Sequence, residues 1–161
     1  MSQIIDEQLK NILNKPDTVA VLSTINGDGT PHTAVMESVR LNESGALEYL
    51  ELLESSRGYR NLTASLWFNK TVSVLVSTPD GTRYLIKGVP DRITVCGAYF
   101  EDRYRQIREN RGDVDLAAVC SIKILEIEDD SFAVKFAQQE SVRPFYKHLD
   151  RITHRIQGEN P

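Results

Sequence analysis

The sequence has few of the features that mark several large protein classes. No apolar run approaches the roughly 18 to 20 residues that a membrane helix needs, and the first residues lack the basic and then apolar regions of a secretory signal. Lys and Arg number 19 against 23 Asp and Glu, a net charge of −4, so no basic excess attracts nucleic acid or anionic lipid. We therefore expect a cytoplasmic protein whose partners include neither nucleic acid nor membrane.

Cysteine, histidine and the common catalytic motifs are equally sparse. The two cysteines, Cys96 and Cys120, stand alone in Val- and Ile-rich segments, which favours buried thiols over a disulfide framework or a zinc site. His32, His148 and His154 contain no pair three or four residues apart, so no metal site is predicted. The chain has no Walker loop, GxGxxG, HExxH, GxSxG or EF-hand loop, which disfavours the nucleotide, metal and hydrolase classes that these motifs define.

What the chain does contain is typical of one compact domain rich in antiparallel strands. With 161 residues, 40% of them hydrophobic and 26% charged, it can bury a substantial core. Runs rich in β-branched residues alternate with Gly, Pro, Asn and Asp turns, and they predict three hairpins. Their strands are residues 18–25 with 31–41, 71–78 with 83–95, and 117–128 with 132–137. Residues 46–53 stay ambiguous, because Leu, Ala and Glu favour a helix while the flanking turns favour a strand.

Helical patterns lie between and around these strands. Apolar residues at helical spacing predict helices at 1–16, 55–69, 97–111 and 144–156. Trp67 and Phe68, at the end of the second helix, are expected in the core or at a dimer seam. Because regular βαβ alternation is missing, a closed or nearly closed barrel is favoured over a doubly wound sheet. We predict a single domain with an N-terminal helix at 1–16, a barrel with inserted helices at 17–137 and a C-terminal helix at 141–157.

The strongest local indication of a binding site is the start of the second helix. Ser55, Ser56 and Arg57 come first, and Arg60 follows one turn later. Free N–H groups and the helix dipole favour an anion there, and hydroxyl and guanidinium groups complete a phosphate cradle. The alternative is a capping serine followed by solvated arginines.

Several short segments also occur in a characteristic order. They are residues 18–24, 29–32, 56–57 with 61–62, 72–76 and 86–88. Together they resemble the FMN-binding split barrel of the pyridoxamine 5′-phosphate oxidase-like superfamily, over residues 15–128. The resemblance implies a mainly β fold, an antiparallel six-stranded split barrel with added helices, in which residues 46–53 form a strand.

The same resemblance implies a cofactor site at a homodimer interface. Ser56 and Arg57 match the motif that holds the FMN phosphate, while Ser55 and Arg60 are added from the physical argument above. The strand residues that would face the flavin ring are Val35, Met36, Glu37 and Ser38.

The chain also departs from this family pattern. Gly58 stands where the family often has Lys, and Ala34 where a strand arginine commonly helps to bind the phosphate. Arg60 and Arg40 are candidates to replace these lost charges. The spacing of Arg151 and His154 differs from the Arg-x-His pair of true pyridoxamine phosphate oxidases, which argues against oxidation of vitamin B6.

These observations predict an FMN-dependent oxidoreductase. No catalytic side chain is assigned, because a flavin itself carries hydride or electrons and the protein supplies position and electrostatics. Two alternatives remain: a non-enzymatic flavin carrier or sensor, and a barrel that has lost FMN and binds another ligand, such as haem or deazaflavin, or acts as an interaction module. The small-molecule redox substrate is not predicted.

Overall fold

The computed structural model describes residues 3–142, and the predicted C-terminal helix at 144–156 lies outside them. The helices are α1 (Gln3–Leu13), α2 (Arg57–Trp67), α3 (Ala98–Arg111) and α4 (Phe132–Val142). The strands are β1 (Val19–Ile25), β2 (Pro31–Met36), β3 (Val39–Leu41), β4 (Leu47–Glu51), β5 (Val72–Ser77), β6 (Arg83–Thr94) and β7 (Ala118–Asp129). None of the described helices is long and apolar enough to cross a membrane.

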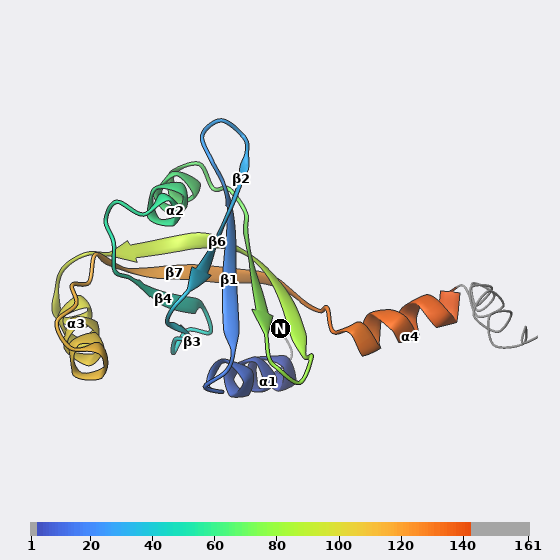
Figure 1. The fold of residues 1–161 in the computed structure, drawn as a ribbon. Helices are drawn as coiled ribbons and strands as arrows, with labels where there is room; N and C mark the ends of the chain where they lie inside the picture. Colours follow the sequence, from blue (N-terminus) through green and yellow to red (C-terminus); the bar gives the residue numbers. More distant parts are fainter. Residues whose placement is uncertain (1–2, 143–161) are drawn as a thin grey trace, which may run out of the picture.

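The seven strands form one antiparallel sheet in the order β2-β1-β5-β6-β7-β4-β3 (Figure 1). Its two edge strands, β2 and β3, follow each other in the sequence and are joined only by residues 37–38. The sheet must therefore curl until its edges can be bridged by this short link. The pairing of the long strands β6 and β7 contains two register shifts. These shifts let both strands bend, so that β6 pairs with β5 on one side and β7 pairs with β4 on the other.

The predicted number of six strands is wrong, because the expected strand 31–41 breaks in two. β2 pairs with β1, and β3 pairs with β4 on the opposite edge of the sheet. One straight strand cannot pair with β1 at one edge of a curled sheet and with β4 at the other edge. The chain therefore turns at Glu37 and Ser38. The backbone N–H of Leu50 donates to Ser38 Oγ at 3.1 Å, which holds this turn against β4.

The predicted strand at 132–137 is also wrong, because these residues begin α4. Phe132 and Phe136 lie one helical turn apart and stack with ring centroids 5.7 Å apart, and Lys135 forms an ion pair with Glu128. The helix-favouring residues Ala, Gln and Glu continue at 137–140. β7 has β6 and β4 as its partners instead, and α4, none of whose residues is buried, extends away from the sheet (Figure 1).

The middle of the ambiguous segment 46–53 forms a strand, β4, as the family resemblance implied. β4 lies between β3 and β7, with Tyr49 opposite Cys120 and Leu47 opposite Ile122. Hydrogen bonding on both sides therefore overrides the helix propensity of its Leu and Glu residues.

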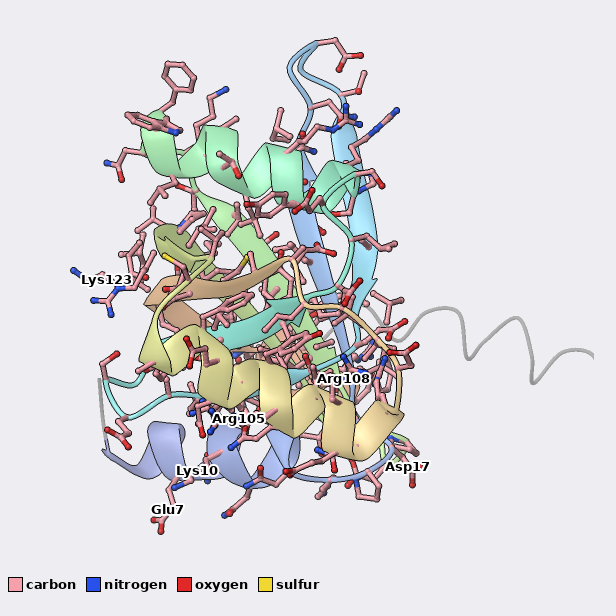
Figure 2. The ribbon with its side chains drawn as sticks, turned by 90° about the vertical axis from the view of Figure 1, so that its left-hand side faces the viewer. Glu7, Lys10, Asp17, Arg105, Arg108 and Lys123 are labelled. Carbon is pink, nitrogen blue, oxygen red and sulfur yellow. The ribbon has the colours of Figure 1, made fainter. Side chains whose placement is uncertain are left out.

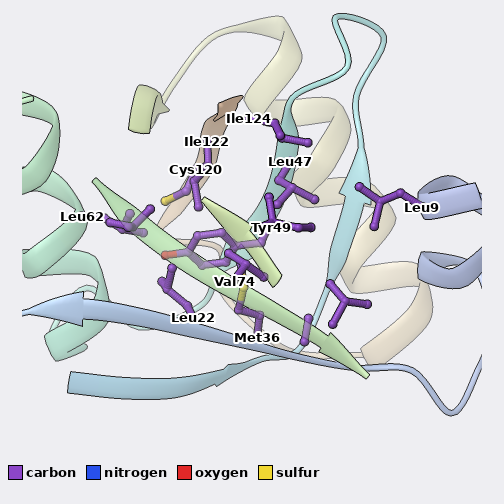
Figure 3. Packing of buried hydrophobic residues seen from close by; sticks show 14 of the residues in the cluster. Leu9, Leu22, Met36, Leu47, Tyr49, Leu62, Val74, Cys120, Ile122 and Ile124 are labelled. Atoms are coloured by element: carbon purple, nitrogen blue, oxygen red, sulfur yellow. The ribbon is translucent and has the colours of Figure 1, made fainter. Parts of the chain in front are cut away.

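The main core fills the concave side of the sheet (Figure 3). Leu62 of α2 and Leu9 of α1 are at most 1% exposed and pack into it. Most of its remaining buried residues lie on the strands, among them Leu22, Met36, Leu47, Tyr49, Val74, Ile86, Cys120 and Ile122. At Gly88, a Cβ atom would lie 2.6 Å from both Ile122 Cγ2 and the Lys123 carbonyl oxygen, so only glycine fits where β6 approaches β7.

The buried carboxylate of Glu48 on β4 connects this strand to β3 and to α3. Glu48 is 2% exposed, and its Oε1 lies 2.7 Å from Arg40 Nη2 and 3.5 Å from Arg103 Nε. The Tyr99 hydroxyl also donates to this carboxylate. A buried carboxylate is costly without a charged partner, so Arg40 is a structural partner of Glu48 together with Arg103.

The two cysteines differ, and the prediction that both are buried is wrong for one of them. Cys120 lies in the core, where burial raises the pKa of its thiol to about 12. Cys96 follows the end of β6 and is exposed.

Candidate functional site

A pocket of about 610 Å³ opens between β2 and β4, close to the start of α2 and to residues 114–115. Its volume falls within the range of roughly 300 to 1,000 Å³ typical of small-molecule sites. Its walls are largely apolar and include Val35, Met36, Leu50 and Leu52. The pocket therefore lies between two strands on opposite halves of the barrel, and only the curl of the sheet brings them together.

One end of the pocket is formed by the first residues of α2. Ser56 is the N-cap, and its Oγ accepts a hydrogen bond from the Tyr59 N–H at 2.9 Å. The N–H groups of the first helical turn have no partner within the helix, and the helix dipole makes this end partially positive. Ser56, Arg57 and Gly58 all line the pocket here, so the predicted anion cradle is part of it.

The position of this cradle depends on Asn61, which is 7% exposed on the inner side of α2. Its Nδ2 donates to Thr24 Oγ1 at 3.0 Å and to Asn26 Oδ1 at 2.9 Å. These bonds tie α2 to the end of β1 and to the turn that follows it. Asn61 thereby holds the start of α2 in place without lining the pocket.

The structure brings together five of the eight predicted cofactor-binding residues. Those that line the pocket are Val35, Met36, Glu37, Ser56 and Arg57, whereas Ser38, Ser55 and Arg60 are not among its lining residues. Ser38 holds the turn against β4, and the other two lie exposed near the start of α2. Arg40, considered as a replacement for the lost phosphate charges, is paired with Glu48 instead.

Sequence reasoning missed the residues that β4 contributes to the pocket. Tyr49 and Glu51 alternate with Leu50 along this strand and all three line the cavity, as do His32 and Asp115. The period of two along a strand would have placed Tyr49 and Glu51 on one face, but helix propensity obscured it. The ion pair between Glu37 and Arg111, 74 residues apart, had no local sequence signal.

Tyr49 lines the pocket and carries an unusual buried polar group. The residue is 5% exposed, and its hydroxyl has no hydrogen-bond partner among the described residues. Its hydroxyl points toward the side of the core where Leu22 and Leu62 lie (Figure 3). Burial raises the pKa of Tyr49 far above its ordinary value, so the phenol stays protonated and can donate. A buried hydroxyl without a well-aligned hydrogen bond is costly. The polar group beside it is the Cys120 thiol, which belongs to the same core cluster.

Glu51 occupies the other side of the cradle. Its Oε2 accepts a hydrogen bond from Ser56 Oγ at 2.8 Å, and its Oε1 accepts one from the Leu53 N–H at 3.1 Å. A carboxylate of this chain thus already uses the serine hydroxyl that a phosphate would need.

The residues present fit a flavin mononucleotide. The apolar walls suit a flat aromatic ring system, and Arg57 with the start of α2 suits a phosphate. Gly58 adds no charge, although a Cβ there would meet only Ser56 Oγ, at 3.9 Å. Among residues 3–142, no group of three or more His, Cys, Asp or Glu side chains is placed to hold a metal ion.

Comparisons with known proteins identify the fold. No protein-family model and no curated protein matches the sequence. Among solved structures, an FMN-binding protein from Syntrophomonas wolfei subsp. wolfei is 16% identical with a TM-score of 0.63, covering 81% of this chain and 91% of that one. A provisionally named pyridoxamine 5′-phosphate oxidase from Listeria innocua is 19% identical with a TM-score of 0.59, covering 78% and 98%.

A third similar structure is HutZ, named as a heme storage protein, from Vibrio cholerae. It is 15% identical with a TM-score of 0.56, and the match covers 76% of this chain and 92% of that one. These likenesses confirm the predicted fold: the chain has the mainly β split-barrel fold that these structures share.

Proposed function

We propose that this protein binds FMN in the pocket between β2 and β4 and acts as an FMN-dependent oxidoreductase. One observation carries the proposal: apolar walls, the start of α2 and the Arg57 side chain meet around a single cavity of about 610 Å³. The similarity to an FMN-binding protein supports the same ligand. FMN, when bound, supplies the hydride or electron transfer, so no protein-borne acid or base is required.

The pocket residues have separate roles in this proposal. Val35 and Met36 of β2 contact the flavin ring, and Arg57 with the N–H groups of α2 binds the phosphate. Glu37 lies at the same wall, where its ion pair with Arg111 neutralises its charge and limits its effect on the ring. In this proposal Ser38, Ser55 and Arg60 contribute from outside the lining of the pocket.

The proposal includes a homodimer in which the second copy covers the open side of the pocket. Val35, at the pocket wall, is 66% exposed, and Trp67 and Phe68 at the end of α2 are 80% and 72% exposed. Large apolar side chains left in water often mark an interface. Sedimentation of the full chain tests this part: a dimer supports it, and a monomer at micromolar concentration contradicts it.

Haem is the second candidate ligand, because one observation favours it. His32 is half-buried and lines the pocket, where its imidazole would be the side chain to bind a haem iron. The similarity to a heme storage protein supports this alternative. A deazaflavin would use the same apolar walls, and a non-enzymatic flavin carrier would use the same site without turnover of NAD(P)H.

The visible absorption spectrum of the purified protein, before and after addition of FMN, separates these ligands. A flavin spectrum, with FMN released by heat and identified by chromatography, supports the proposal, whereas a Soret band indicates haem. A colourless protein that does not bind added FMN contradicts it. Steady-state assays with NAD(P)H and an electron acceptor then distinguish an oxidoreductase from a carrier.

Arg57→Ala tests the site itself. Hydrogen bonds to charged groups contribute about 1.5 to 3 kcal/mol, so we expect the Kd for FMN to rise about tenfold or more. Arg105→Ala removes the same charge from an exposed residue of α3 (Figure 2) that does not line the pocket, and it serves as the control. Arg60→Ala shows whether the second arginine of α2 takes part. An unchanged Kd in Arg57→Ala would place the phosphate elsewhere.

A further inference from the structure

We infer that Glu51 sets how much the phosphate of the ligand contributes to binding, so that the pocket holds a flavin mainly by its ring. This inference rests on the proposed function and concerns the same pocket. It predicts that riboflavin, which has the ring but not the phosphate, binds nearly as well as FMN.

The first argument is the hydrogen-bonding capacity of Ser56. Its hydroxyl has one proton, and that proton is donated to Glu51 Oε2 at 2.8 Å. The same oxygen accepts the Tyr59 N–H at 2.9 Å as the cap of α2. Ser56 therefore has no proton to donate to a phosphate until Glu51 moves away. The Leu53 N–H, which donates to Glu51 Oε1 at 3.1 Å, holds the carboxylate in this position.

The second argument is the charge around the cavity. Arg57 is the one Lys or Arg side chain among the described residues that line the pocket, whereas Glu37, Glu51 and Asp115 contribute three carboxylates. Glu37 is paired with Arg111, and Gly58 provides no cation beside the cradle. A phosphate dianion would thus meet one arginine and the carboxylate of Glu51 at the same helix start. Repulsion between like charges at this range opposes the attraction of the arginine and the helix dipole.

A separate observation indicates a ligand held by its ring. The buried Tyr49 hydroxyl has no partner in the part of the chain that the structure describes, and Tyr49 lines the same pocket as the apolar side chains of β2 and β4. A planar aromatic ring covers these apolar walls, and a phosphate alone does not. Binding therefore draws mainly on the ring.

Titration of the full-length protein with FMN and with riboflavin, followed by flavin fluorescence, tests the inference. For the wild type, we expect the two Kd values to agree within about threefold. Glu51→Gln keeps the size of the side chain and removes its charge. It should tighten FMN binding about tenfold, the size of effect that removal of one nearby like charge produces, and change riboflavin binding less than about twofold.

Two further variants make the result specific to Glu51. Glu54→Gln removes an equal charge from an exposed neighbour that does not line the pocket, and it should leave the ratio of the two Kd values unchanged. Gly58→Lys adds a cation at the cradle, where the backbone has room for a side chain, and it should tighten FMN binding alone. Thermal unfolding of each variant verifies that it folds, and the wild-type ratio tests the inference even if Glu51→Gln does not fold.

The outcomes separate this inference from the proposed function. If neither flavin binds the wild type, the proposed function fails and the inference fails with it. If both bind, the inference alone is overturned by a wild-type preference for FMN of about 100-fold or more, or by a Glu51→Gln variant whose two Kd values change in parallel. Tighter FMN binding in Gly58→Lys but not in Glu51→Gln also overturns it, because the phosphate then reaches the cradle without competing with Glu51.

Discussion

Tyr49→Phe removes one oxygen atom from the pocket and leaves the packed ring in place. The hydroxyl is buried and unpartnered among the described residues, in a side chain that is 5% exposed. A buried polar group without a hydrogen bond costs about 1 to 3 kcal/mol. The free energy of unfolding of the ligand-free variant should therefore be about 1 kcal/mol higher than that of the wild type. This difference raises Tm by about 2 to 4 °C for a protein of this size.

The same substitution should weaken ligand binding. If the flavin ring presents an acceptor to the Tyr49 hydroxyl, the loss of one hydrogen bond worth about 0.5 to 1.5 kcal/mol raises the Kd for FMN about 2- to 10-fold. Added FMN should then stabilise the variant less than it stabilises the wild type. A stabler ligand-free protein with weaker binding is the combination expected of a group whose partner is the ligand.

Chemical unfolding with and without saturating FMN, together with FMN titration, measures both effects. Tyr84→Phe, on β6 and outside the pocket lining, is the matched control and should leave the Kd unchanged. If ligand-free Tyr49→Phe is less stable than the wild type, the hydroxyl has a partner of its own, the neighbouring Cys120 thiol, and the reasoning is wrong. An unchanged Kd for FMN would refute the assigned contact with the ring.

Two further predictions concern ionisable groups. The pKa of Asp80 lies well below its usual 3.8, chiefly because the Thr78 hydroxyl donates to the carboxylate and also because the Thr82 N–H does. The ionised carboxylate therefore stabilises the folded protein at pH values above about 4. We expect Tm to fall as the pH drops below about 4, and to fall less steeply in Asp80→Asn; equal slopes in thermal melts at several pH values would contradict this. For the thiols, a disulfide reagent at neutral pH should label Cys96 in the folded protein and Cys120 only after unfolding, because burial raises the pKa of Cys120 to about 12. Rapid labelling of both thiols in the folded protein would show that the core opens easily.

The elements that depend on neighbouring residues could be predicted from the sequence. The turn at residues 26–30 has Gly29 at φ 84°, and Asp28 accepts hydrogen bonds from the N–H and hydroxyl of Thr30, so the residue types alone indicate the hairpin. Ser56 caps α2 through a bond that spans three residues. Because that bond is equally local, the residue types at Ser56 and Arg57 are enough to indicate the anion cradle.

Pairings across the barrel could not be predicted in this way. β4 is a strand because β3 and β7 flank it, and β7 is about 70 residues away in the chain. The break at Glu37 and Ser38 arises because β2 and β3 pair with different strands at opposite edges of the sheet. Neither feature has a local signature, since each depends on how far the sheet curls.

The sequence by itself therefore determined the hairpin of β1 and β2 at residues 19–36, the capped start of α2 and the split-barrel resemblance, because short-range hydrogen bonds and backbone preferences specify them. The tertiary structure decided what the pocket contains. It placed Tyr49 and Glu51 opposite β2, with the Glu51 carboxylate against Ser56. The physical reason is that strand pairing at long range sets which side chains face one another, and a pocket between two strands exists only after the sheet has curled.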